Sequence, residues 1–133
     1  MSVPAVIVIA KSPQPGRSKT RLCPPCTAAQ AAGLAEAALS DTLDAAVATR
    51  AARTVVALEG EPGDWLPRGA AVLAQRGEGL AERLAAAFED VGGPALVVAM
   101  DTPQLTPALL ELAFARLQSP GVDAVLGPSR DGG

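Results

Sequence analysis

The 133-residue sequence predicts a single α/β domain with a mainly parallel sheet between helices. Apolar, β-branched runs alternate along the chain with segments whose apolar residues recur at helical spacing. The 13 glycines and 12 prolines suit many short connections. Because alternating strands and helices build right-handed βαβ units, we expect the strands to be parallel. Ligands of such sheets bind beyond the carboxyl ends of the strands.

The first expected strand is the continuous apolar run 3–10, which is typical of a strand buried on both faces. The loop 11–26 follows, and its four prolines keep it non-helical. The segment Thr27–Gln30 has the form of a capping box and predicts a helix from there to about Thr49. The helix face expected to point into the core carries Leu39, Leu43 and Val47.

Two more strands are expected at Arg53–Leu58 and Ala70–Gln75. The Gly/Pro-rich connection 60–69 between them carries Trp65. We interpret Trp65 as a lid over apolar surface, with stacking on a ligand as the alternative.

The second half repeats the alternation. A helix over Leu80–Val91 should end at the glycine pair 92–93, before a strand over Pro94–Met100. Thr106-Pro107 predicts the start of a helix to about Gln118, since Thr is a good N-cap and Pro suits the first helical position. A fifth strand is expected over Val122–Leu126. The expected inward residues of the two helices are Leu80, Leu84, Phe88 and Val91, then Leu109, Leu110, Ala113 and Leu117.

The loop after the first strand concentrates positive charge. It holds both lysines of the chain and two arginines, whereas the first carboxylate is Glu36, in a protein of net charge −3. A cationic loop at the end of a buried strand predicts a site for an anion, most simply phosphate. The run Gly16–Thr20 lacks the Gly-x-x-x-x-Gly-Lys spacing, which argues against Walker-type ATP hydrolysis.

Several function classes are disfavoured. The sequence has no histidine, which excludes Ser-His-Asp and Cys-His catalysis within the chain. Few aromatic residues and an acidic balance argue against nucleic-acid partners. No apolar run approaches the roughly 20 residues needed to span a membrane, and the N-terminus does not resemble a signal peptide. We therefore expect no membrane partner and a cytoplasmic location.

Two cysteines form the motif Cys23-Pro24-Pro25-Cys26. Without histidine or a second pair they cannot complete a four-ligand zinc site. A redox dithiol is one interpretation, and two incidental thiols in a loop is the favoured one.

Two aspartates follow expected strands. Asp101 ends the strand 94–100, where it is either a ligand for a divalent cation or a turn and capping residue. Asp131, after the fifth expected strand, is a second candidate metal ligand, with an ordinary turn residue as the alternative.

Four segments together resemble an uncharacterised bacterial glycosyltransferase-A-like family of the nucleotide-diphospho-sugar transferase superfamily. They are residues 10–22 (AKSPQPGRSKTRL), 75–83 (QRGEGLAER), 100–105 (MDTPQL) and 126–133 (LGPSRDGG). The resemblance covers essentially the whole chain and implies a Rossmann-like three-layer α/β/α fold. Family members continue past the last segment, so the resemblance implies a domain lacking its C-terminal part. An exposed sheet edge left by such truncation would favour a homodimer.

The resemblance also implies roles for individual residues. Asp101 would take the metal-binding place of the superfamily's acidic motif, which here has one carboxylate, and would act with Lys19 in catalysis. Mg²⁺ or Mn²⁺ would neutralise the departing diphosphate. The residues implied to bind nucleotide are Lys11, Gly16, Lys19, Thr20 and Arg21 for the diphosphate, and Gln75, Gly77 and Arg83 for the base and ribose.

The implied function is a metal-dependent transferase that uses a nucleotide-activated small-molecule donor, most simply a nucleotide sugar. Related superfamily members are nucleotidyltransferases, such as 2-phospholactate guanylyltransferase, so nucleotidyl transfer is an alternative. A nucleotide-binding fragment without turnover is another. The residues do not identify the acceptor.

Overall fold

The computed structural model describes residues 3–102 and 104–127, in which four strands form one parallel sheet ordered β3-β2-β1-β4. The central strand β1 pairs with β2 on one side and with β4 on the other, and its last residue, Lys11, is in register with Glu59 of β2. The predicted parallel sheet is therefore confirmed. The strands are β1 (Ala5–Lys11), β2 (Arg53–Glu59), β3 (Ala70–Ala74) and β4 (Ala95–Ala99).

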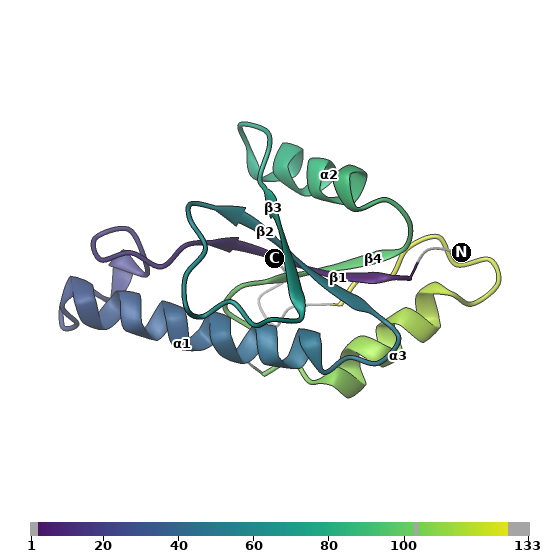
Figure 1. Cartoon of the computed structure of the whole chain (residues 1–133), viewed down its shortest axis with the longest axis horizontal. Coiled ribbons are helices and arrows are strands. Elements are labelled where there is room, and N and C mark those ends of the chain that lie inside the picture. The colour runs from purple at the N-terminus through teal and green to yellow at the C-terminus, as the bar shows by residue number, and fades with distance from the viewer. Residues whose placement is uncertain (1–2, 103, 128–133) are drawn as a thin grey trace.

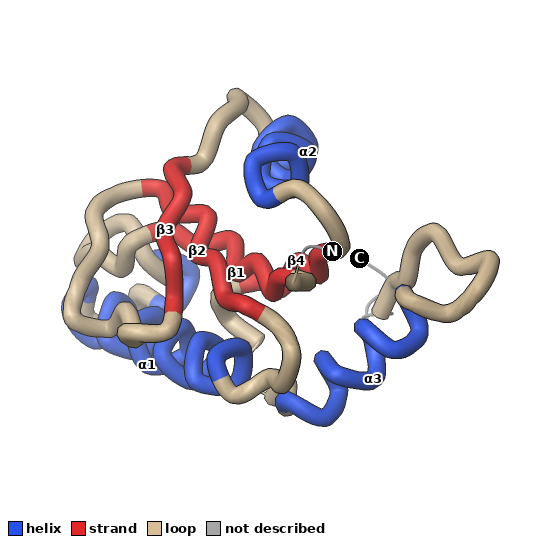
Figure 2. Tube along the Cα trace, turned by 45° about the vertical axis from the view of Figure 1, so that its right-hand side comes forward, coloured by secondary structure: helices blue, strands red, loops and turns tan. Residues whose placement is uncertain are grey.

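Helices cover both faces of the sheet. In Figures 1 and 2, α1 and α3 lie on one face and α2 lies on the other, which gives the expected α/β/α layers. A short 3-10 helix, η1, lies in the loop between β1 and α1. The helices are η1 (Thr20–Leu22), α1 (Ala28–Val47), α2 (Leu80–Val91) and α3 (Pro107–Leu117).

The helix starts follow their sequence signals. At α1 the Thr27 hydroxyl accepts the Gln30 N–H at 3.1 Å, and the Gln30 side chain accepts the Thr27 N–H at 2.9 Å. This reciprocal capping box satisfies two backbone donors that the helix leaves unpaired. At α3 the Thr106 hydroxyl accepts the Leu109 N–H at 3.2 Å, with proline at the first helical position.

Two apolar clusters hold the layers together. The smaller one, under α2, consists of Ile7, Ala57 and Ala87. Trp65 is half-buried against the larger one, which confirms its interpretation as a lid. The larger cluster lies on the α1 and α3 side and contains Val6, Val8, Ala10, Leu39, Leu43, Ala46, Val56, Leu58, Leu110 and Phe114.

Part of the expected helix packing is wrong. Leu80 is 67% exposed and Phe88 44%, while Ala86 and Ala87 are the buried residues of α2. Small side chains let the helix lie close to the sheet, so the large ones are displaced to its flanks. The same misassignment of the inward face affects Val47 at the end of α1 and Leu109 in α3, which are 40% and 51% exposed.

The prediction of a fifth strand over Val122–Leu126 is also wrong, because residues 122–127 have no regular secondary structure. The Val122 N–H donates to the Ser119 carbonyl in a turn, at 3.2 Å. Val125 and Leu126 line an apolar cavity of about 670 Å³ against β4 and α3. Apolar contact of this kind does not align a backbone, so the strand propensity of the segment is not realised. Asp131 lies outside the described residues.

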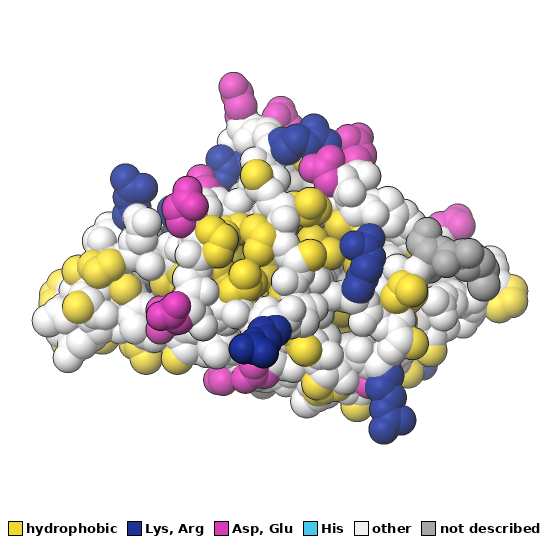
Figure 3. Space-filling view, viewed as in Figure 1, with side chains coloured by type: hydrophobic (Ala, Val, Ile, Leu, Met, Phe, Trp, Pro, Cys, Tyr) yellow, Lys and Arg dark blue, Asp and Glu magenta, His cyan; other side chains and the backbone are white. Residues whose placement is uncertain are grey.

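β3 is an edge strand of the sheet that the described residues form. The helix α2 packs on β1 and β4. Hydrophobic side chains therefore gather at the surface over β2 and β3, below the charged surface of α2 (Figure 3). Val72 of β3 is 37% exposed. Association through a sheet edge stays a prediction.

Candidate functional site

Polar residues from all four strands meet at one edge of the sheet. Lys11 ends β1 and Glu59 ends β2, while Gln75 directly follows β3 and Asp101 lies two residues after the end of β4. Because the strands are parallel, their carboxyl ends lie at the same edge. The fold therefore brings together segments that are far apart in the sequence.

Three neighbouring cavities lie at this edge, and the Lys11 side chain contributes to all three. Their volumes are about 430, 280 and 360 Å³, which together exceed the roughly 300 Å³ minimum of small-molecule sites. The first is lined by Ile9, Ala10, Lys11, Glu59, Gln75, Glu78, Leu80, Arg83 and Met100. The second is lined by Lys11, Arg17, Ser18, Lys19, Ala35, Met100 and Asp101. The third is lined by Lys11, Ser12, Gln14, Gly16, Arg17, Thr20, Glu59 and Gly60.

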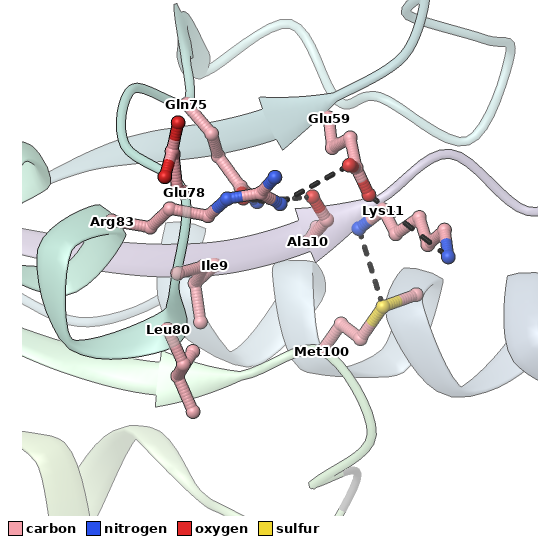
Figure 4. Close-up of a pocket in the computed structure, with 9 residues that line it drawn as sticks. All are labelled: Ile9, Ala10, Lys11, Glu59, Gln75, Glu78, Leu80, Arg83 and Met100. Atoms are coloured by element: carbon pink, nitrogen blue, oxygen red, sulfur yellow. Dashed lines mark hydrogen bonds and ion pairs between the residues drawn. The ribbon is translucent and has the colours of Figure 1, made fainter.

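In the first cavity, Gln75 joins the ends of two strands (Figure 4). Its Nε2 donates to the Ala10 carbonyl at 2.8 Å and to the Ala57 carbonyl at 3.0 Å. Its Oε1 accepts a hydrogen bond from Arg83 Nη1 at 3.2 Å. Both amide protons are thus used within the protein, so Gln75 shapes the cavity rather than presenting free donors to a ligand.

Arg83 is held in one orientation by three acceptors. Its Nε donates to the Gly77 carbonyl at 3.0 Å, and Nη1 donates to Glu59 Oε1 at 3.1 Å as well as to Gln75. Within residues 3–102 and 104–127, Nη2 has no hydrogen-bond partner, which leaves two donors for a ligand. Gly77 makes this turn possible: its φ is +111°, and a Cβ there would lie 2.8 Å from the Glu82 Cβ.

The turn that carries Gln75 and Gly77 is tied to the end of α2. Arg76 donates from Nε to Asp90 Oδ2 and from Nη2 to Asp90 Oδ1, both at 2.9 Å, and from Nη2 to Glu89 at 3.2 Å. These hydrogen bonds lower the pKa of Asp90 and raise the pKa of Arg76. The two segments that frame the first cavity are therefore clamped together at the surface.

The second cavity places Lys19 opposite Asp101. Lys19 Nζ lies 3.9 Å from Asp101 Oδ2, and the two side chains are 31% and 56% exposed. Lys19 has a left-handed backbone, with φ 47° and ψ 43°, which is unfavourable for a residue with a side chain. Lys11 and Arg17 add positive charge to the same cavity. The arrangement suits an anion bound beside a carboxylate.

The loop between β1 and η1 is closed by its own hydrogen bonds. The Arg17 and Ser18 N–H groups donate to the Gln14 carbonyl at 3.1 and 3.0 Å, and the Gln14 N–H donates to Ser18 Oγ at 2.8 Å. Gly16, at φ +81°, takes the turn that this closure requires. The loop separates the second cavity from the third, and Arg17 lines both.

The predicted site residues mostly come together. Lys11, Lys19 and Asp101 meet in the second cavity, Gln75 and Arg83 in the first, and Gly16 and Thr20 in the third. Arg21 lies in η1 and lines none of these three cavities, and Gly77 acts through the turn that its backbone forms. The roles of these residues stay predictions.

Sequence reasoning missed Glu59, which lines the first and third cavities and forms an ion pair with Arg83. The available signal was its position directly after the expected strand Arg53–Leu58, where the carboxyl ends of parallel strands meet. Met100 and Glu78 also line the first cavity and were not singled out.

Neither the cysteines nor a preformed acidic cluster adds a metal centre. Cys23 and Cys26 are free thiols, Cys23 exposed and Cys26 partly so. Over the described part of the chain, no three His, Cys, Asp or Glu side chains gather as metal ligands. Asp101 thus fits a cation only in the manner typical of Mg²⁺, with phosphate oxygens and water as the other ligands.

Comparison with known proteins finds similarity to a bacterial family and to solved structures. A family described as "Uncharacterized protein conserved in bacteria (DUF2064)" matches residues 29–133. The crystal structure of a "putative nucleotide-diphospho-sugar transferase" from Desulfovibrio desulfuricans G20 superposes with a TM-score of 0.82 at 29% sequence identity. That match covers 99% of this chain but only 61% of the other. No curated protein gives a significant sequence match.

The similarity confirms the Rossmann-like fold expected from the sequence, over the part of that neighbour which this chain spans. Among the helices of residues 3–102 and 104–127, none is long and apolar enough to cross a membrane.

Proposed function

We propose that this chain, which belongs to the DUF2064 family, is the donor-binding part of a metal-dependent transferase that uses a nucleotide-diphospho-sugar. The observation that carries the proposal is the Lys19–Asp101 pair, 3.9 Å apart, in a cationic cavity at the carboxyl edge of a parallel sheet. The name of the structural neighbour agrees with a nucleotide-sugar donor.

The second cavity is the proposed site of the diphosphate. Lys11, Arg17 and Lys19 surround it with three positive charges, and such groups form strong, charge-assisted hydrogen bonds with phosphate oxygens. The hydrogen bonds of the closed loop fix the backbone at Arg17, from which its side chain extends. Preorganised cations stabilise the charge that develops when the diphosphate departs.

Asp101 is the residue that would hold a divalent cation. It is exposed at the rim of the diphosphate cavity and supplies one carboxylate, which Mg²⁺ or Mn²⁺ would share with phosphate oxygens and water. A bound cation would supply Lewis-acid neutralisation of the leaving group. Lys19 would contact the same leaving group. An acceptor nucleophile would form a bond to the sugar carbon as the bond from that carbon to the diphosphate oxygen breaks, and the diphosphate would leave next to the Lys19 ammonium.

Nucleotidyl transfer is a second candidate function, favoured by the third cavity. Thr20 and Arg17 line this cavity, and their side chains could donate hydrogen bonds to the third phosphate of a nucleoside triphosphate. Such a reaction releases pyrophosphate rather than a nucleoside diphosphate, so the product distinguishes the two.

The proposal is tested by titrating the chain with UDP-, GDP- and dTDP-sugars and with nucleoside triphosphates, each with and without Mg²⁺ or Mn²⁺, while Tm is recorded. We expect stabilisation by at least one diphospho-sugar, increased by the cation. If none of these compounds raises Tm, the nucleotide-binding proposal is wrong. Binding without product from any acceptor tried would instead leave a donor-binding module that does not turn over.

A further inference from the structure

Glu59 is a carboxylate placed among cations that would bind an anionic ligand. It ends β2, is in register with Lys11, and lines the first and third cavities. Its side chain is 43% exposed. A carboxylate in this position repels phosphate, so the ligand groups that it can contact favourably are hydrogen-bond donors and cations.

The two carboxylate oxygens of Glu59 are unequally used (Figure 4). Oε1 accepts a hydrogen bond from Arg83 Nη1 at 3.1 Å. Oε2 lies 4.0 Å from Lys11 Nζ, too far for a hydrogen bond, and it accepts none from any side chain or backbone group in the described ranges. An exposed pair at this separation is weak, so Oε2 is available to a ligand.

The covalent order of a nucleotide places its ribose near Glu59. The first cavity has apolar walls from Ile9, Leu80 and Met100, which suit a planar base, and the second has the phosphate-binding cations. Lys11 and Met100 line both cavities. Because ribose lies between base and diphosphate, it must cross this shared boundary, where Lys11 pairs with Glu59.

We propose that Glu59 Oε2 accepts a hydrogen bond from the ribose 2′-hydroxyl and makes the site selective for ribonucleotide over 2′-deoxyribonucleotide donors. The inference rests on the proposed function. In dinucleotide-binding α/β folds, an Asp or Glu about 20 residues after the Gly-rich turn likewise accepts a hydrogen bond from the ribose 2′-hydroxyl. Arg83 holds Oε1, and Oε2 lies on the side of Lys11, the residue that lines both the first and the second cavity.

The experiment compares UDP with dUDP and GDP with dGDP, binding to the full 133-residue chain in Mg²⁺ buffer by isothermal titration calorimetry. We expect the ribonucleotide of the bound pair to bind about tenfold more tightly, as for a hydrogen bond to a charged group. In Glu59→Ala this preference should fall to less than about twofold. Glu59→Gln should keep part of it, because the amide oxygen still accepts a hydrogen bond.

Glu61→Gln is the matched control, since it removes an exposed carboxylate two residues away and should leave the preference unchanged. A cooperative thermal unfolding transition verifies that each variant is folded. If Glu59→Ala does not fold, the preference is measured in Glu59→Gln, where it should be smaller than in the unaltered protein. Equal affinities in the unaltered protein, or a preference that survives in both Glu59 variants, would overturn the role of Glu59 while leaving the proposed function intact. If neither UDP nor GDP binds but a dTDP-sugar raises Tm, the selectivity for ribonucleotides is overturned. If none of the diphospho-sugars or nucleoside triphosphates raises Tm, the proposed function itself fails.

Discussion

Lys19 and Asp101 are 82 residues apart in the sequence, yet their side chains lie 3.9 Å apart at the mouth of one cavity. The two residues reach this point because β1 and β4 are adjacent and parallel, so the segments that follow them leave the sheet side by side. Neither residue is buried, and the pair is therefore open to a ligand that exchanges their mutual contact for its own.

Because Lys19 is proposed to bind phosphate and Asp101 to bind a cation, substitutions of the two residues should weaken ligand binding in different ways. Lys19→Ala should weaken nucleotide binding with and without Mg²⁺, whereas Asp101→Ala should remove the difference that Mg²⁺ makes. A ligand at about 100 times its Kd stabilises a protein by about 2.7 kcal/mol, so thermal shifts will report both losses. The control is Arg116→Ala, a cation in the last turn of α3. A Mg²⁺ effect that persists in Asp101→Ala would contradict the cation-binding role.

Gln75 should contribute to stability more than its position in a turn implies. Gln75→Leu leaves the carbonyls of Ala10 and Ala57 without their side-chain donor and frees Arg83. We expect a loss of about 1–3 kcal/mol in the free energy of unfolding, measured by urea denaturation. Gln118→Leu, at an exposed position, should change this free energy little. A loss no larger than that of the control would mean that the bridge between the strands is weak.

Gly77 and Gly79 form a matched pair for testing the turn before α2. A Cβ at Gly77 would lie 2.8 Å from the Glu82 Cβ at a φ of +111°, whereas a Cβ at Gly79 meets nothing within 4 Å. Gly77→Ala should therefore destabilise the protein by about 1–3 kcal/mol and displace the Gly77 carbonyl from Arg83. Gly79→Ala should be much milder. Similar unfolding midpoints for the two variants would show that the turn adapts.

The Arg76–Asp90 contact predicts an acid-dependent loss of stability. Hydrogen bonds from Arg76 are the main cause of the lowered pKa of Asp90. A carboxyl whose pKa is lower in the folded state stabilises the fold above its ordinary pKa, and this contribution is lost as the pH falls through the lowered value. Because the contact is exposed, the effect should be small.

The measurement is Tm against pH from neutral to acid for the unaltered protein and Asp90→Asn. The variant should lose less Tm on acidification, and the two curves should converge at the lowest pH. Asp64→Asn, which changes an exposed aspartate elsewhere, should leave the slope unaltered. Parallel curves for Asp90→Asn would indicate that the contact does not persist in solution.

The fold was predictable where the signals are local. Capping at Thr27 and Thr106 and the apolar run of β1 depend on short segments, and each forms as expected. The inward face of α2 was not predictable, because the choice of Ala87 over Phe88 depends on how closely the helix approaches the sheet. The strand expected over Val122–Leu126 was wrong for a related reason: a strand needs a neighbouring strand to pair with as well as residues of high β-propensity.

The location of the candidate site was predictable from the sequence, but the hydrogen bonds and ion pairs within it were not. Strand ends and the cationic loop located Lys11, Lys19 and Asp101, since parallel topology alone brings them to one edge. The contacts of Glu59 and Gln75 depend on side-chain directions across three strands, for which the sequence has no local signal. Gln75 therefore changed from an expected ligand contact to a residue that holds the site in shape.

Lys11, which lines all three cavities, would make their occupancies interdependent. Anions in two neighbouring cavities would share the field of one ammonium group, so each would bind more weakly in the presence of the other. Thermodynamic linkage makes this antagonism reciprocal. A free anion such as inorganic phosphate in one cavity would thus promote release of a diphosphate from the next.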